Sequence, residues 1–257
     1  MITIKITDVE NTKSFTFQNS KVLGGLMNQI NGFEYATPVI SIDEVAGDQG
    51  AVKVNSKFGR RVCSFVYTIT CDVLDNRKLI LAAMRQTGFL KLVEFTTLDN
   101  MNLQFEAYVS KFVAPYTSMM KPVLIELTVP DWRLYSQTEH TSTISRNDSG
   151  IVNNAGDEFT NPILRIKGPF TNAIVTNLNN GTALSITTTL IAGEYVDINT
   201  KNQTVVQDDG TELYSALDGT PDFIILEPGN NTIQFSDTGG DVNTELDVIW
   251  RDAYLGV

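Results

Sequence analysis

Apolar and polar residues alternate along most of the chain, which is the period-two pattern of half-buried β-strands. In "MITIKITDVE" at the N-terminus, Ile2, Ile4 and Ile6 alternate with polar residues. The segment Leu90 to Phe95 leads through "TTLDNMN" into "LQFEAYVSKF", which predicts a β-hairpin. The first half of the chain is therefore predicted to be mainly β.

One segment of the first half has the helical period instead. In "LDNRKLILAAMRQTG" one stripe is formed by Leu79, Ile80, Ala83, Met84 and Thr87. We expect a helix at about residues 75–87. Asp75 would cap its start, because a carboxylate can accept from free backbone N–H groups, and Gly88 would take the left-handed conformation beyond its end. The stripe is predicted to pack against a sheet.

The second half reads as strands and turns throughout. The strand segments are "NPILRIKG", "NAIVTNL", "TALSITTTLI", "DFIIL", "TIQF" and "ELDVIW". Turn signals such as "NNG", "PGNN" and "TGG" recur roughly every 8–15 residues, which is typical of an antiparallel sandwich or barrel. In the last strand Leu246, Val248 and Trp250 share one face and are predicted to lie in the core.

A polar segment separates the two halves. "SQTEHTSTISRNDSGIVNNAGDEFTN" (Ser136 to Asn161) is nearly free of aromatic residues and is interpreted as a crossing between domains, with room for one short strand. We predict an N-terminal domain of residues 1–140 and a C-terminal domain of residues 141–257.

The stretch "EYVDINTKNQTVVQDDG" could be a calcium loop or a hairpin. A calcium loop of the EF-hand type needs an oxygen ligand at position 5 and glycine at position 6, but counting from Asp197 these positions hold Lys201 and Asn202. As a hairpin, Lys201 and Asn202 make the turn, with Asn202 tolerating a positive φ. Val196 and Ile198 would then point inward, and Val205 and Val206 would lie on the returning strand. We therefore favour the hairpin.

The composition offers little for catalysis. The one histidine, His140, falls in the polar crossing and is predicted to be solvated, so it is a poor candidate for a Ser-His-Asp arrangement. Without a second histidine or paired cysteines, the common His/Cys zinc sites lack their ligands. Cys63 and Cys71 fall on one predicted strand, too far apart for a disulfide, and are interpreted as buried thiols. There is no glycine-rich phosphate loop. We predict no catalytic residues, cofactor or metal site, and no enzyme activity.

Charge narrows the possible partners. With 30 acidic and 19 basic residues the net charge is -11, which disfavours general nucleic-acid binding. No apolar run approaches the ~18 residues of a membrane span. A basic exception is "VKVNSKFGRR", which holds Lys53, Lys57, Arg60 and Arg61. This cluster is either a solvated loop or a contact patch for an acidic partner.

The order of these segments resembles the distal tail protein (Dit) family of long-tailed, non-contractile bacteriophages. In the first half the resemblance lies in "DNRKLILAAMRQTGFLKLVEFTTLDNMNLQFEAYVSKF" and "VLIELTVPDWRLYSQT". In the second half it lies in "NPILRIKG", "LIAGEYVDINTKNQTV", "FIILEPGNNTIQF" and "VIWRDAYLGV". The resemblance implies two β-sandwich domains, of which the first is tail-tube-like with a single helix and the second is galectin-like.

The resemblance also implies a structural virion protein at the distal end of a phage tail, made in the host cytoplasm. It would form a homo-hexameric ring that joins the tail tube above to the tail-tip or baseplate proteins below, with a channel through which DNA passes without specific binding. Ring closure needs a heterologous interface. We place part of it at Ala46 to Arg61, with candidate contacts Lys53, Lys57, Phe58, Arg60 and Arg61.

Two other functions stay open. A carbohydrate-binding sandwich that adheres to host glycans is the main alternative, although aromatic residues for stacking on sugars are few. A small glycosidase needs only two carboxylates, and pairs such as Glu94 with Glu106 or Glu245 with Asp247 lie on predicted strands.

Overall fold

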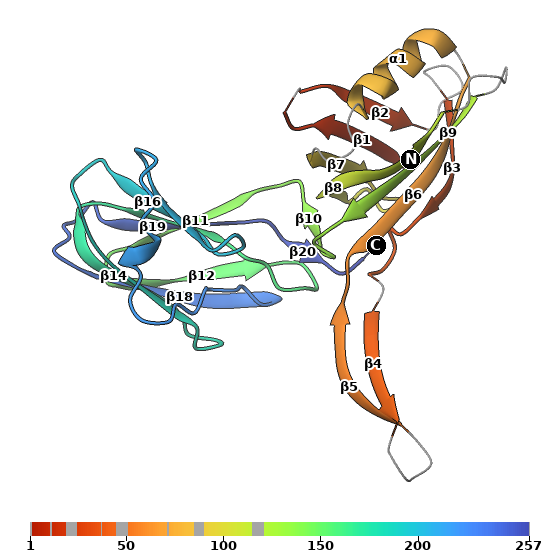
Figure 1. Ribbon diagram of the computed structural model, residues 1–257. Helices are drawn as coiled ribbons and strands as arrows, with labels where there is room; N and C mark the ends of the chain where they lie inside the picture. The colour runs from red at the N-terminus through yellow and green to blue at the C-terminus, as the bar shows by residue number, and fades with distance from the viewer. Residues whose placement is uncertain are drawn as a thin grey trace. The chain divides into compact units, whose positions relative to one another are not determined.

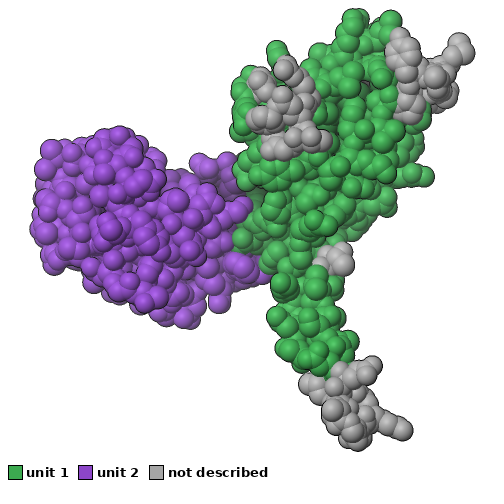
Figure 2. All heavy atoms as spheres, viewed as in Figure 1, with its two compact units in different colours: residues 1–137, 255–257 green, residues 138–254 purple. Residues whose placement is uncertain are grey.

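A computed structural model of the chain describes residues 2–10, 12–18, 25–36, 38–44, 51–70, 72–84, 90–114 and 121–256. Its ribbon consists mostly of β-strands (Figure 1). The chain divides into two compact units (Figure 2). Unit 1 comprises Met1–Gln137 and Leu255–Val257, and unit 2 comprises Thr138–Tyr254.

Unit 1 is built on one antiparallel sheet. Along its main path the order of the strands is β2-β1-β7-β8-β9-β6-β3, and β10 pairs with β8. The bounds are β1 Thr3–Asp8, β2 Ser14–Gln18, β3 Gly25–Asn31, β6 Arg61–Ile69, β7 Leu90–Thr96, β8 Asn102–Val113, β9 Lys121–Val129 and β10 Leu134–Ser136. β7 and β8 form the predicted hairpin, which is confirmed.

The sheet of unit 1 curls until its two ends meet over one core. Phe17 on β2 packs edge-on against Phe65 and Tyr67 on β6, with ring centroids 5.0 and 5.1 Å apart. These strands are far apart in the order of the sheet, so only a closed arrangement brings them together. The alternation seen in the sequence supplies the inward side chains, because successive residues of a strand point to opposite faces.

Helix α1 (Val73–Ala83) lies against β1, β2 and β6 (Figure 1). Ile80, Ala83 and Met84 of the predicted stripe are buried, but Leu79 is exposed. The helix starts earlier than predicted, so Asp75 lies in its first turn and Asp72 stands at the N-cap without a side-chain hydrogen bond. Thr87 and Gly88, like Cys71, lie outside the described residues.

Unit 2 contains two antiparallel sheets with a shared core. One has the order β11-β19-β13-β16-β17 and the other β12-β18-β14-β15. The bounds are β11 His140–Ser145, β12 Asp148–Asn154, β13 Ile163–Lys167, β14 Phe170–Asn177, β15 Ala183–Leu190, β16 Tyr195–Asn199, β17 Thr204–Gln207, β18 Gly229–Thr238 and β19 Glu245–Trp250. β20 (Ala253–Tyr254) is also part of unit 2 but belongs to neither of these sheets. A short 3₁₀ helix covers Tyr214–Ala216.

The core of unit 2 is formed by the inner faces of both sheets. Leu246, Val248 and Trp250 of β19 are buried in it, as predicted. Mainly β structure in several sheets is thus confirmed for the chain.

The polar segment Ser136 to Asn161 contains the change from unit 1 to unit 2, after Gln137, but it has more regular structure than the sequence suggested. It holds two strands rather than one, since β11 pairs with β19 and β12 pairs with β18. Each strand belongs to a different sheet of unit 2. The strands were hidden in the sequence because few of their residues are apolar, and the only buried ones are Ile144, Val152 and Asn154.

The calcium-loop stretch is a hairpin, as predicted, formed by β16 and β17. Val196, Ile198 and Val205 are fully buried, whereas Val206 is only partly buried. The residue with positive φ is Gln203, at 55°, and not Asn202.

Candidate assembly surface

β4 (Pro38–Glu44) and β5 (Ala51–Phe58) form an antiparallel ribbon separate from the main sheet of unit 1. Within the described residues neither strand pairs with any other strand, so each has one unpaired edge. Figure 1 shows the ribbon extending away from the sheet of unit 1. A two-stranded ribbon is marginally stable by itself, so contacts at its base and along its faces decide its stability.

The ribbon exposes apolar side chains beside lysines. Val39, Ile40, Ile42 and Val54 are 46–61% exposed. The strand register places Lys57 opposite Val39 and Lys53 opposite Ile42, and both lysines are exposed. Clustered exposed apolar residues mark surfaces that another molecule covers. The contact residues predicted from the sequence include these lysines but not the apolar residues, although "PVISIDE" and "AVKVNSK" both have strand alternation.

The base of the ribbon is fixed by aromatic packing. The ring of Phe58 lies 4.6 Å from that of Trp132 and 6.1 Å from that of Tyr35, measured between centroids. Phe58 is partly buried and anchors the ribbon within unit 1, and its role as a subunit contact stays a prediction.

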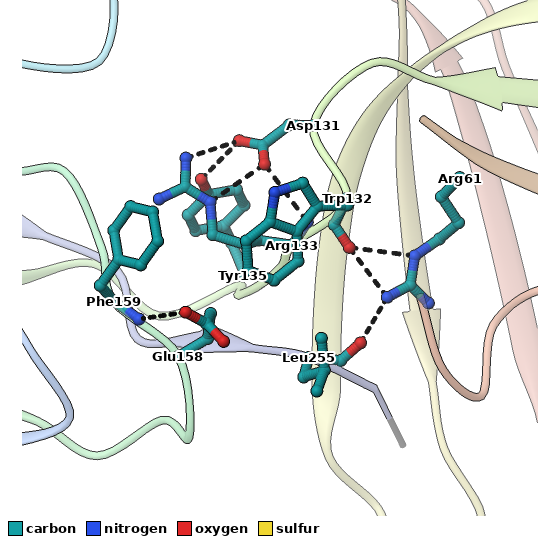
Figure 3. A network of polar contacts seen from close by, with 8 residues as sticks. All are labelled: Arg61, Asp131, Trp132, Arg133, Tyr135, Glu158, Phe159 and Leu255. Carbon is teal, nitrogen blue, oxygen red and sulfur yellow. Dashed lines mark hydrogen bonds and ion pairs between the residues drawn. The ribbon is translucent and has the colours of Figure 1, made fainter. Parts of the chain in front are cut away.

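Arg61 is also an internal residue, although it was predicted to be a subunit contact. Its side chain donates from Nε and Nη2 to the carbonyl oxygen of Trp132, at 3.1 and 2.8 Å, and from Nη2 to that of Leu255, at 2.5 Å (Figure 3). Nη1 donates to the carbonyl oxygens of Gly32 and Phe33. Burial lowers the pKa of Arg61.

Arg60, the residue before Arg61, is exposed. Lys53, Lys57 and Arg60 therefore remain as basic candidates for a subunit contact, and residues 46–50 of the predicted interface lie outside the described part of the chain.

A second polar cluster fixes the segment that holds Trp132. Asp131 accepts from Nε of Arg133 at 3.0 Å and from the hydroxyl of Tyr135 at 2.6 Å (Figure 3). The Arg133 guanidinium also lies over the rings of Trp132 and Tyr135. Burial is the main reason that the pKa of Tyr135 is raised, followed by the charge of Asp131. These contacts hold Trp132 as a rigid support for Phe58.

The reactive side chains have structural surroundings. Cys63 is buried and donates from Sγ to the carbonyl oxygen of Gly32, and burial raises its pKa to about 12, so its nucleophilic thiolate is scarce at neutral pH. In the described ranges no group of three or more His, Cys, Asp and Glu residues could hold a metal ion. No helix within those ranges is long and apolar enough to cross a membrane.

His140 lies on a strand rather than in a linker, and its side chain is 39% exposed. It lies on β11 opposite Trp250 of β19, and its ring stacks on the indole at a centroid distance of 5.4 Å. Its Nε2 is 3.2 Å from Oδ2 of Asp252, whose Oδ1 accepts from the backbone N–H of Ala155. The histidine therefore joins a strand to a loop within unit 2.

Residues 155–254, which lie within unit 2, match the family described as "Siphovirus-type tail component, C-terminal domain". The predicted resemblance to phage tail components is thereby confirmed. A search of the curated proteins found no match to the chain.

Solved structures share the fold over nearly the whole length. The SPP1 Dit protein (gp 19.1), described as a paradigm of the hub adsorption apparatus in phages that infect Gram-positive bacteria, is 17% identical, with a TM-score of 0.69 over 98% of this chain and 99% of that one. One chain of the phage P2 baseplate structure, in its activated conformation with Ca, is 14% identical, with a TM-score of 0.55 over 97% of this chain and 98% of that one. At these identities the likeness shows the fold alone.

Proposed function

We propose that this chain, in which residues 155–254 match the C-terminal domain of siphovirus-type tail components, is the distal tail (Dit) hub of a long-tailed bacteriophage. It forms a homo-hexameric ring at the distal end of the virion tail. The ring joins the tail tube above to tail-tip or baseplate proteins below and leaves a channel for DNA. The role is structural, and support for it comes from the family match and from a fold shared with SPP1 Dit along both chains.

The single observation that carries the ring proposal is the uncovered ribbon of β4 and β5. Its apolar side chains and free strand edges are unfavourable in water, and they become favourable when a neighbouring subunit covers them. A ring needs a surface that meets a different surface on the next copy, and a projecting ribbon is suited to such a heterologous contact. The lysines on it would pair with acidic groups of an acidic neighbour, since the net charge is -11.

The net charge also suits a DNA channel. An acidic protein repels the phosphate backbone, so DNA moving through the ring would not be retained.

The test is the mass of the assembly in light scattering and its image in negative stain. The wild-type protein should have about six times the subunit mass and appear as rings. Ile42→Asp and the double variant Lys53→Glu/Lys57→Glu should give folded subunits that no longer assemble, because each places unfavourable charge at the contact.

Lys201→Glu is the matched control, since it reverses the charge of an exposed lysine in a turn of unit 2 and should leave the rings intact. Wild-type protein that stays a single subunit at every concentration would refute the ring. Rings that persist in both ribbon variants would remove the ribbon from the interface.

A further inference from the structure

The two sheets of unit 2 have outer faces of different chemistry. On the five-stranded sheet, charged side chains pair across strands. Arg165 binds Asp197 at 2.7 Å, and Lys167 lies 2.8 Å from Asp247. The hydroxyl of Thr143 also donates to Asp247. On this face, these charged side chains are therefore paired with opposite charges on neighbouring strands.

The outer face of the four-stranded sheet, which we name the neutral face, carries no charge. It consists of the outward side chains of β12, β18, β14 and β15, all of which the structure describes, and these are serine, threonine, asparagine, glutamine, isoleucine and alanine. The register aligns Ser149, Gln234 and Thr176 in one row across the sheet. The next row aligns Ser236, Ile174 and Ser185.

The carboxylate of Asp218 stands beside β15, at the edge of the neutral face. Asp218 accepts from the hydroxyl of Ser185 at 2.6 Å and from that of Thr187 at 2.9 Å. Its backbone N–H donates to the carbonyl oxygen of Ser185, which fixes its position at the strand. The hydrogen bonds from Ser185 and then Thr187 lower the pKa of Asp218, so the exposed carboxylate stays ionised at neutral pH.

These groups match a saccharide better than other partners. Protein interfaces are depleted in serine and need an apolar centre, whereas the outward positions of these four strands hold mainly serine, threonine, asparagine and glutamine, with two large apolar side chains in different rows, Ile174 at 44% and Ile151 at 67% exposed. Nucleic acid needs cations, which the outward positions lack. A neutral sugar presents hydroxyls that can bond to the amides, hydroxyls and carboxylate, and a C–H surface that can lie on Ile174.

We propose that the neutral face binds a neutral, hydroxyl-rich polysaccharide, at a site centred on Asp218, Ser185, Ile174 and Ser236. Asp218 accepts from sugar hydroxyls with the lone pairs that Ser185 and Thr187 leave free. Binding by one copy is weak because no aromatic ring stacks on the sugar, and several copies in one assembly would strengthen it. Only this strengthening rests on the proposed hexamer.

The test is affinity electrophoresis of the full chain through gels that contain one neutral polysaccharide each: dextran, a β-1,3-glucan, a galactan or a mannan. At least one gel should retard the wild-type protein. Asp218→Asn removes the charged acceptor and Ser236→Glu places a charge on the face, so each should weaken retardation about tenfold. Thr141→Glu adds the same charge to the exposed outer face of the other sheet and should leave the retardation unchanged.

No retardation in any of the four gels would refute the proposal. Equal retardation of the wild type and both neutral-face variants would also refute it. Concentration-dependent association that Ser236→Glu abolishes would instead make this face a contact between copies. Light scattering on the same samples reports the ring, so failure of the saccharide site and failure of the hub are told apart.

Discussion

Arg60 and Arg61 are neighbours in the sequence but have different surroundings. Arg60 is exposed, and Arg61 donates to four backbone carbonyl groups inside unit 1. Both were predicted to belong to one basic cluster, because the charge of a residue does not tell whether its side chain points into the protein or into solvent. Lys91 resembles Arg61 in being a basic residue inside unit 1: it is fully buried, and its Nζ donates to Oδ2 of Asp8 at 2.7 Å.

We predict that Arg61→Ala lowers the free energy of unfolding by about 3 kcal/mol, because it leaves buried carbonyl groups without donors. Arg61→Lys should recover only part of the loss, since an ammonium cannot reach as many acceptors as the planar guanidinium. Urea unfolding followed by circular dichroism measures both. Arg60→Ala is the control and should change stability by less than about 0.5 kcal/mol; a loss as large as that of Arg61→Ala would contradict this account.

At the scale of elements, alternation predicted strands well where inward residues are apolar, as in β7, β8 and β19. It failed for β11 and β12, whose inward residues include His140 and Asn154. The helix was predicted at about residues 75–87, but α1 spans Val73–Ala83. The predicted helix ends too late because the apolar stripe of the sequence continues beyond the end of α1. In the β16–β17 hairpin the strands were predicted correctly and the backbone of the turn was not.

We predict that Gln203→Gly stabilises the protein by about 1 kcal/mol. Gln203 has a φ of 55°, where a side chain is strained and glycine is not. Asn202→Gly, in the same turn, should be neutral or destabilising, because the structure does not give Asn202 a positive φ. The midpoints of thermal unfolding of the two variants and the wild type measure these effects. A stabilising effect confined to Asn202→Gly would support the turn predicted from the sequence, in which Asn202 has the positive φ.

At the scale of the whole molecule, unit 1 is completed by residues from the far end of the chain. The carbonyl of Leu255 accepts from Arg61, and Gly256 forms a β-bridge with Tyr35. Gly256 also lies against the backbone of Glu34, where a Cβ would collide with the carbonyl oxygen. Unit 1 therefore depends on residues that follow unit 2 in the sequence.

We predict that deleting residues 255–257 destabilises unit 1 by about 2 kcal/mol and leaves unit 2 unchanged. Hydrogen exchange resolved by peptide should show faster exchange in β6 and slow exchange preserved in β19. Gly256→Ala should act in the same direction. Uniform protection in β6 after the deletion would show that these terminal contacts do not support unit 1.

The sequence by itself determined that this chain is mainly β, placed a helix close to α1, and predicts no common catalytic or metal site. These conclusions follow from periodicity and composition, which are local properties. The tertiary structure alone decided that Arg61 is internal, that Val39 and Ile42 are exposed on a ribbon, and that Asp218 meets Ser185 and Thr187. These facts depend on which strands become neighbours, and the pairing of distant strands is set by the packing of the whole core.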